Sequence, residues 1–191
     1  WERALKGANT DIYCPMYASQ AYCQKYADSD KPEDQKPLIQ CEYNHAMGNS
    51  SGGFKEYWDI VRQNKRFQGG FIWDFVDQAL IGSVPPEKGK SVRTLMYGGD
   101  YNDYDASDNN FNCNGFITTD RKMTPQAYEI GYQYQSIWTT LKDKEKGVVD
   151  VKNEYFFRDL KNYRLRWELV QDNGTVIDKG TIDDLDIAPQ Q

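Results

Sequence analysis

LIQCEYNHAMGNSSGGFKEYWDIVRQNKRFQGGFIWDF, residues 38–75, decides the fold. It begins with a continuous apolar run, 38–43, which predicts a strand covered on both faces. Apolar residues then recur at the spacing of an amphipathic helix within 51–63, namely at Phe54, Tyr57, Trp58 and Val61. FQGGFIWDFVDQAL, 67–80, predicts a second strand, opened by a glycine pair. Strand, helix and strand in this order indicate an α/β unit.

The flanking segments extend this pattern in both directions. NTDIYCPMYAS, 9–19, predicts a buried strand that Pro15 stops. The polar stretch 81–114 predicts a long loop, and loops of that length in compact domains are usually functional or disordered. MTPQAYEIGYQYQSIWTTL, 123–141, predicts a helix with Thr124 as its N-cap and proline at its first position.

The periodicity changes after Lys146. Alternating residues at 163, 165, 167 and 169 are apolar, and QDNGTVIDKG, 171–180, places Asp-Asn-Gly between two strands, which predicts a hairpin. We therefore expect two parts. Residues 1–145 form an α/β part, and residues 146–191 form the start of an antiparallel β-sandwich, with about four strands.

Composition excludes several functions. A net charge of -6 argues against binding to nucleic acid or to an anionic membrane, and no apolar run approaches the roughly 18 residues of a membrane helix. One histidine and four cysteines without a C-x-x-C pair make a zinc site improbable. We expect Cys41 to be a small buried hydrophobe and the other cysteines to be free thiols or core residues.

The predicted strand ends carry the chemistry. Tyr17 follows the first predicted strand, Glu42 follows the second, and the pair Trp73-Asp74 lies in the third. The carboxyl ends of parallel barrel strands converge on one rim. No G-x-S-x-G elbow, P-loop or dinucleotide glycine motif accompanies them. A carboxylate among aromatic residues favours glycoside chemistry, although a salt-bridged structural carboxylate at Glu42 stays open on these local features.

The motif CEYNHAMGNSSGGFKEYWDIVRQNKRFQGGFIWDFVDQAL, 41–80, resembles the nucleophile region of glycoside hydrolase family 2 β-galactosidases of the LacZ type. The similarity extends back to TDIYCPMYA and forward through YGGD and NCNG, and NEYFFRDL and DIAPQ resemble the next domain of that family. The resemblance implies a partial (β/α)8 TIM barrel, about its last three strands and helices over 1–145. The start of an immunoglobulin-like β-sandwich over 146–191 is implied to follow it.

The resemblance also implies catalytic roles. Glu42 corresponds to the nucleophile that forms a covalent galactosyl-enzyme, and Tyr17 to the tyrosine that hydrogen-bonds this carboxylate. His45 matches the residue that contacts sugar hydroxyls and stabilises the transition state.

Further positions match binding residues of the family. Trp73 corresponds to the tryptophan whose indole packs against the galactose ring at the base of the site. Asn114 and the backbone carbonyl of Phe111 match positions that bind a sodium ion near the sugar. Magnesium is expected in the parent enzyme, with ligands outside this chain.

The chain departs from the family pattern in what it lacks. The acid/base glutamate of the family lies in an Asn-Glu pair upstream, and no such pair precedes Glu42 here. Asn153-Glu154 lies in the expected sandwich and cannot serve, and we expect Asp74 and Asp77 to be structural acids. The segment 82–96 also differs in length from well-known members. We therefore expect the remainder of the parent polypeptide to be a partner, and this chain alone to be inactive.

Two rival interpretations stay open. One is a non-catalytic carbohydrate-binding or structural module derived from a barrel, and the other is a family 2 glycosidase with another sugar, such as a β-glucuronidase or β-mannosidase. HAMGNS, 45–50, favours galactosidase. A homo-oligomer is possible for the parent, and the residues do not decide between a cytoplasmic and a periplasmic location in a bacterium.

Overall fold

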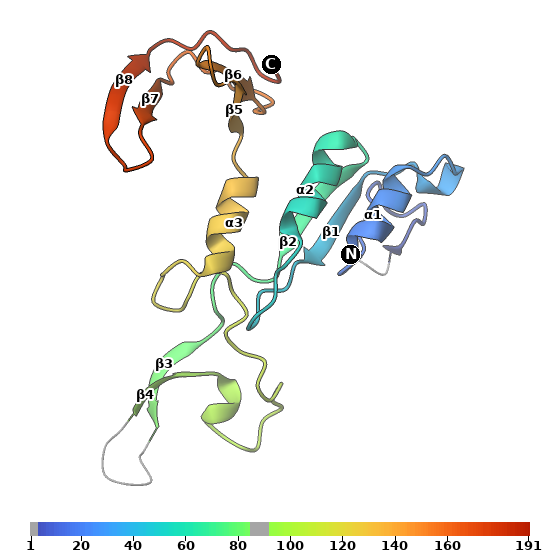
Figure 1. The fold of residues 1–191 in the computed structure, drawn as a ribbon. Helices are drawn as coiled ribbons and strands as arrows, with labels where there is room; N and C mark the ends of the chain where they lie inside the picture. The colour runs from blue at the N-terminus through green and yellow to red at the C-terminus, as the bar shows by residue number, and fades with distance from the viewer. Residues whose placement is uncertain (1–3, 85–91) are drawn as a thin grey trace. The chain divides into compact units, whose positions relative to one another are not determined.

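A computed structural model describes residues 4–84 and 92–191. The chain divides into two compact units, Trp1–Gln133 and Tyr134–Gln191. Helices α1 to α3 and strands β1 to β4 belong to the first unit, and strands β5 to β8 belong to the second (Figure 1). Each unit is described below by itself.

A parallel sheet forms the centre of the first unit. Strand β1 (Leu38–Tyr43) pairs in parallel with β2 (Phe67–Ile72). On the other edge of β1, isolated parallel bridges join Tyr13 to Leu38 and Met16 to Glu42. The predicted strand over 9–19 is therefore reduced to two bridges. Pro15, which lies between them, has no N–H to donate to a ladder.

Strand β1 contains one extra residue. Three steps along the chain, from Tyr13 to Met16, are matched by four steps on β1, from Leu38 to Glu42. The pairing of β1 with β2 shifts twice: the extra residue lies on β2 between Leu38 and Gln40, and on β1 between Gln40 and Tyr43. This mismatch is a β-bulge, which redirects the side chains of the bulged strand.

The bulge decides which residues of β1 face the helices. The Gln40 amide lies against Cys23 of α1, 3.5 Å from its sulfur, and the Tyr43 ring packs against Phe54 and Tyr57 of α2. Regular alternation would place residues 40 and 43 on opposite faces. Because both face helices, we infer that Cys41 and Glu42 share the face turned away from them.

Two helices cover the sheet (Figure 1). Helix α1 (Gln20–Ala27), which the sequence pattern did not predict, begins at Ser19, whose hydroxyl accepts from the Tyr22 N–H at 3.2 Å. Helix α2 (Phe54–Gln63) begins after Gly53, at φ 69°, and not after the predicted cap Ser50 or Ser51. Only glycine adopts this left-handed conformation without a steric cost.

The core of the first unit lies between these helices and the sheet. Its buried apolar residues come from all of these elements and from α3 (Pro125–Gln133), and they include Cys23, Tyr26, Leu38, Tyr43, Phe54, Phe67 and Ile130. The fully buried thiol is thus Cys23, whereas Cys41 is only half-buried, so the prediction for Cys41 was wrong. All four cysteines are free, as expected.

Two predicted segments have other bounds in the structure. The strand predicted over 67–80 ends at Ile72. Part of the predicted loop 81–114 forms a hairpin of β3 (Leu80–Val84) and β4 (Val92–Met96), followed by the short helix η3 (Gly98–Asp100). A further short helix, η2, spans Pro32–Asp34. The length difference predicted within 82–96 falls partly on 85–91, outside the described residues.

The helix predicted over 123–141 begins at Pro125 as expected but ends at Gln133. Residues beyond it form β5 (Ile137–Asp143), because Ile137, Trp138 and two threonines prefer a strand that can pair with β6 (Val148–Asn153). The predicted hairpin is confirmed: β7 (Leu165–Val170) and β8 (Val176–Ile182) pair antiparallel around Gly174, at φ 84°.

Within the described ranges, the sheets are small and none closes into a barrel. Nor does any helix in these ranges combine the length and apolar character needed to cross a bilayer.

Candidate active site

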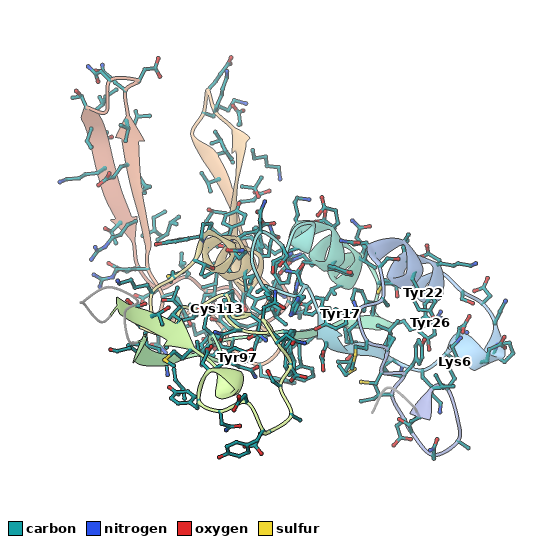
Figure 2. The ribbon with its side chains drawn as sticks, turned by 90° about the horizontal axis from the view of Figure 1, so that it is seen from below. Lys6, Tyr17, Tyr22, Tyr26, Tyr97 and Cys113 are labelled. Atoms are coloured by element: carbon teal, nitrogen blue, oxygen red, sulfur yellow. The ribbon has the colours of Figure 1, made fainter. Side chains whose placement is uncertain are left out.

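Glu42 and Tyr17 meet at the end of β1. The Tyr17 N–H donates to the Glu42 carbonyl at 2.8 Å, and the Tyr17 side chain, labelled in Figure 2, hydrogen-bonds the Glu42 carboxylate. Burial of the phenol raises the pKa of Tyr17, and the hydrogen bond and charge of Glu42 raise it further. The phenol therefore stays protonated and able to donate to the carboxylate.

His45 lies against two aromatic rings. Its imidazole stacks on Phe111 with ring centroids 5.6 Å apart and an interplanar angle of 7°, and it meets the Tyr17 ring edge-on at 6.1 Å. The Ser50 and Ser51 hydroxyls both donate to the His45 carbonyl, at 2.6 and 3.0 Å. The serines predicted as helix caps thus fix the loop that carries the imidazole.

Backbone hydrogen bonds connect Trp73 and Asn114 to this loop. The Ala46 N–H donates to the Trp73 carbonyl at 2.8 Å, and the Asp74 N–H donates to the Asn114 carbonyl at 2.8 Å. The peptide bond between Trp73 and Asp74 is cis. The structure therefore brings together Tyr17, Glu42, His45 and Phe111 by side-chain contact, and Trp73 and Asn114 through the backbone.

Three of these residues carry unpaired polar atoms. Among the described residues, the buried side-chain atoms without a hydrogen-bond partner are His45 Nε2, Trp73 Nε1, Asn114 Oδ1 and Thr119 Oγ1. Each buried polar atom left without a partner lowers the stability of the fold by about 1–3 kcal/mol. Several such atoms in one region therefore indicate a binding site for a polar ligand. A donor, an acceptor and an imidazole in one region match the mixed donors and acceptors of a polyhydroxylated ligand.

The Asn114 amide has a defined orientation. Asn114 is fully buried, its Nδ2 donates to Gln78 Oε1 at 3.4 Å, and its Oδ1 is the atom left unpaired. No group of three or more His, Cys, Asp or Glu side chains that could hold a metal occurs among the described residues. A carbonyl-type oxygen such as Asn114 Oδ1 suits a hard cation.

Asp77, Gln78 and Gly115 support this amide, and the sequence pattern assigned them no role in the site. The Gly115 N–H donates to Asp77 Oδ1 at 2.9 Å, next to the Asn114–Gln78 contact. The signal available in the sequence was the polar pair Asp77-Gln78 inside an otherwise apolar run. The other acid of that run, Asp74, accepts from the Phe75 N–H at 2.5 Å.

Asn153-Glu154 is fully engaged in the second unit. Asn153 is buried, and its Nδ2 donates to the carbonyls of Arg158 and Ala188 at 2.8 and 3.0 Å. The Glu154 carboxylate accepts from Trp138 Nε1 at 3.0 Å and from Lys152 Nζ at 2.8 Å. These contacts give the pair a structural role.

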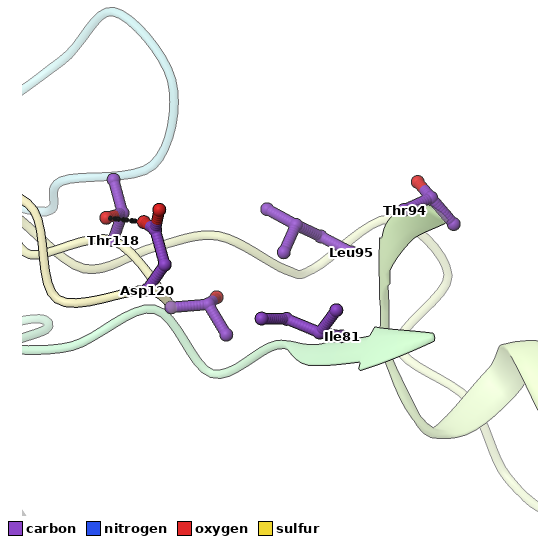
Figure 3. Close-up of a pocket in the computed structure, with 6 residues that line it drawn as sticks. Ile81, Thr94, Leu95, Thr118 and Asp120 are labelled. Atoms are coloured by element: carbon purple, nitrogen blue, oxygen red, sulfur yellow. Dashed lines mark hydrogen bonds between the residues drawn. The ribbon is translucent and has the colours of Figure 1, made fainter. Parts of the chain in front are cut away.

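A cavity of about 350 Å³ lies elsewhere in the first unit (Figure 3). It is lined by Ile81, Thr94, Leu95, Thr118, Thr119 and Asp120. The Asp120 carboxylate is already paired with the Thr118 hydroxyl at 2.6 Å and with Lys122 at 2.7 Å. No predicted site residue lines this cavity, and the one unpaired buried polar atom among its lining residues is Thr119 Oγ1.

Comparisons with known proteins identify the family of the chain. Residues 1–139 match the family model described as glycosyl hydrolases family 2, TIM barrel domain, and residues 149–191 match β-galactosidase, domain 4. The chain is 40% identical to a β-galactosidase of Aeromonas hydrophila, over 95% of this chain, and 42% identical to one of Photobacterium profundum, over 91%. It spans only 18% of the length of each. The chain belongs to glycosyl hydrolase family 2.

Proposed function

We propose that this chain supplies the nucleophile and part of the sugar-binding site of a retaining β-galactosidase. The observation that carries the proposal is the Glu42–Tyr17 contact beside the buried unpaired atoms of His45 and Trp73. The β-galactosidase names of the relatives favour a galactoside over a glucuronide or mannoside.

Glu42 acts first in the proposed reaction. Its carboxylate attacks the anomeric carbon, the bond to the leaving oxygen breaks, and an acid supplied by the rest of the parent polypeptide protonates that oxygen. Water then attacks the anomeric carbon of the covalent glycosyl-enzyme, gives its proton to the residue that had acted as the acid, and releases the Glu42 carboxylate. Tyr17, kept protonated, donates to that carboxylate and orients it.

Trp73 and His45 bind the sugar. The indole presents a flat apolar surface to the pyranose ring, and its unpaired N–H and the His45 Nε2 atom pair with hydroxyl groups. Both atoms are buried without a partner, so binding a hydroxyl removes a desolvation cost.

Asn114 Oδ1 and the backbone carbonyl of Phe111 would hold a sodium ion beside the sugar. The fit rests on the unpaired, buried Asn114 oxygen. When bound, the sodium ion would supply a positive charge next to the sugar-binding residues. Magnesium, in this proposal, has its ligands outside this chain.

The fold follows from the same proposal. The bridged segment near Tyr13, β1 and β2, with their helices, are the last three strands of an eight-stranded barrel, and the second unit begins an immunoglobulin-like sandwich. The remainder of the parent polypeptide is then the obligate partner, and the isolated chain does not turn over galactosides.

A mechanism-based label tests the nucleophile. A 2-deoxy-2-fluorogalactoside, given to the parent polypeptide, should label the peptide that carries Glu42, as read by mass spectrometry after proteolysis. Glu42→Gln should lower kcat for a nitrophenyl galactoside by on the order of 10⁴-fold or more. Asp120→Asn, a surface carboxylate outside the site, is the matched control and should retain activity. Labelling of any other residue would contradict the proposal.

A non-catalytic carbohydrate-binding module is the second candidate. It is favoured by the engaged state of Asn153-Glu154, because no other Asn-Glu pair occurs in the chain to act as the acid. Saturable galactose binding by the parent polypeptide, without turnover and without fluorosugar labelling, would establish it.

A further inference from the structure

Two of the four free thiols lie side by side. Cys14 and Cys41 share a side-chain hydrogen bond, and both residues are half-buried. The Cys41 N–H also donates to the Pro15 carbonyl at 3.0 Å, so the two cysteines lie on adjacent, parallel stretches of backbone. The bridge between Tyr13 and Leu38 puts Cys14 level with Ile39, so Cys14 and Cys41 are diagonal neighbours. Diagonal neighbours lie about 7 Å apart between Cα atoms, close to the upper limit that a disulfide spans, so closing the bond draws the two segments together.

The thiol pair borders the proposed nucleophile. Cys41 directly precedes Glu42, and Cys14 is three residues before Tyr17. The bulge in β1 puts Cys41 and Glu42 on the same face, so the two cysteines lie next to the Glu42–Tyr17 contact.

The other two cysteines have different surroundings. Cys23 is fully buried in α1, where its thiol contacts the Ala18 carbonyl at 3.9 Å and the Gln40 amide. Cys113 lies beside the Asp77 carboxylate, in the loop that carries Asn114. The arrangement therefore singles out Cys14 and Cys41 as the pair able to react with each other.

We propose that Cys14 and Cys41 form a dithiol site that closes to a disulfide by exchange with a low-molecular-weight disulfide such as oxidised glutathione. One thiolate attacks a sulfur of the reagent, and one equivalent of reagent thiolate leaves. The second cysteine, as its thiolate, attacks the protein sulfur of the mixed disulfide and expels the other. The protein loses two protons and two electrons, and one reagent disulfide becomes two thiols.

The environment sets the rate of this exchange. Burial and the neighbouring Cys14 thiol raise the pKa of Cys41, so its thiolate is scarce at neutral pH. Closure is therefore slow near pH 7 and speeds up as the pH rises. A closed bond tethers the residue before Glu42 to the segment that leads to Tyr17, so we expect it to disturb their contact. This last step rests on the proposed function, whereas the disulfide itself does not.

The 191-residue chain allows a direct test. It is incubated with oxidised glutathione at pH 7 and pH 8.5, free thiols are alkylated, and unreduced peptides are mapped by mass spectrometry. We expect a Cys14–Cys41 linkage that forms faster at pH 8.5 and disappears with dithiothreitol. Cys14→Ser and Cys41→Ser should each abolish the linkage, and Cys113→Ser should leave it unchanged.

The unfolded chain is the internal control. In 8 M urea, loop closure favours the nearest pair, Cys14–Cys23, which are 9 positions apart, over Cys14–Cys41, which are 27 apart. A 14–41 linkage that predominates only without urea supports the proposal. Stable glutathione adducts on both residues without a cross-link, or a predominant 14–23 linkage in the folded chain, would overturn it.

Activity of the parent polypeptide gives the second readout. Oxidation should lower galactoside hydrolysis several-fold, dithiothreitol should restore it, and Cys14→Ser should be insensitive to oxidation. A Cys14–Cys41 linkage with unchanged hydrolysis would refute the disturbance of Glu42 but keep the dithiol site. If no preparation hydrolyses galactosides, the proposed function fails while the mapped linkage still decides the disulfide.

Discussion

Tyr17 occupies an unusual backbone conformation for a tyrosine. Its φ of 51° lies in the left-handed region, where a side chain is disfavoured by roughly 1 kcal/mol or more. The conformation coincides with the Tyr17 N–H donating to the Glu42 carbonyl while the phenol bonds the Glu42 carboxylate. Two contacts between the same two residues fix the direction in which the carboxylate points.

Tyr17→Phe removes the bond to the carboxylate and keeps the ring. A hydrogen bond to a charged group contributes about 1.5–3 kcal/mol, so kcat of the parent polypeptide should fall about 10- to 100-fold. Steady-state hydrolysis of a nitrophenyl galactoside measures the change. Tyr104→Phe, at a phenol that is 83% exposed, is the control. An unchanged kcat in Tyr17→Phe would show that the phenol does not act on Glu42.

At the scale of elements, one close contact joins the two loops of the site. A parallel bridge links Val76 to Ile117, and a Cβ atom on Gly115 would overlap the Val76 carbonyl carbon and the Asp77 nitrogen. Only a residue without a side chain allows this approach of two backbones. Asn114 precedes that contact directly.

Gly115→Ala should therefore destabilise the first unit, by about 1–3 kcal/mol or more, because backbone has to move. Gly131→Ala is the matched control in α3: a Cβ there meets nothing within 4 Å, and helix propensity predicts a gain of about 0.5–1 kcal/mol. Urea unfolding of the 191-residue chain compares the two variants. Equal effects would rule out the close approach.

The elements also show how far sequence reasoning reached. Helix α2 and strands β1 and β2 were predicted because their periodicity is strong, and the β7–β8 hairpin because Asp-Asn-Gly fixes its turn. Helix α1 was missed because its eight residues include three polar ones and little apolar periodicity. The switch to β5 after Gln133 was missed because Ala127, Gly131, Tyr134 and Trp138 fit a helical spacing by coincidence. Only pairing with β6 reveals the strand.

The site was less accessible to pattern reasoning than the fold. Local features left Glu42 open to a structural role, and its assignment came from the resemblance to a family. The roles of Asp77 and Gln78 depend on a contact between segments about 36 residues apart, which no periodicity encodes. The catalytic and binding roles of the six predicted site residues remain predictions; these residues are Tyr17, Glu42, His45, Trp73, Phe111 and Asn114.

At the scale of the whole molecule, alkaline pH should weaken the first unit. Burial raises the pKa of Cys23 to about 12 and also raises the pKa values of Tyr13 and Tyr17. Above the ordinary values, near 9 for the thiol and 10 for the phenols, the unfolded chain releases protons that the folded chain retains. The unfolded state then binds fewer protons, so the free energy of unfolding falls as pH rises from about 9 towards 12.

Urea unfolding at pH 7, 9 and 11 measures this loss. Cys23→Ala should reduce the decline between pH 9 and 11, because one of the groups is gone, although the variant is less stable at pH 7. Tyr104→Phe should leave the slope unchanged. A parallel decline in the wild type and Cys23→Ala would show that Cys23 does not contribute.

The extra residue in β1 has a consequence for insertions and deletions. Removing Cys41 would match three steps with three and restore ordinary alternation: Gln40 and Tyr43 would still face the helices, and Glu42 would still lie opposite Met16. Only the local redirection of the Glu42 side chain by the bulge would be lost. A gene shortened by that one codon would keep every residue assigned to the site, so its remaining activity would measure what the bulge contributes to the direction of the carboxylate.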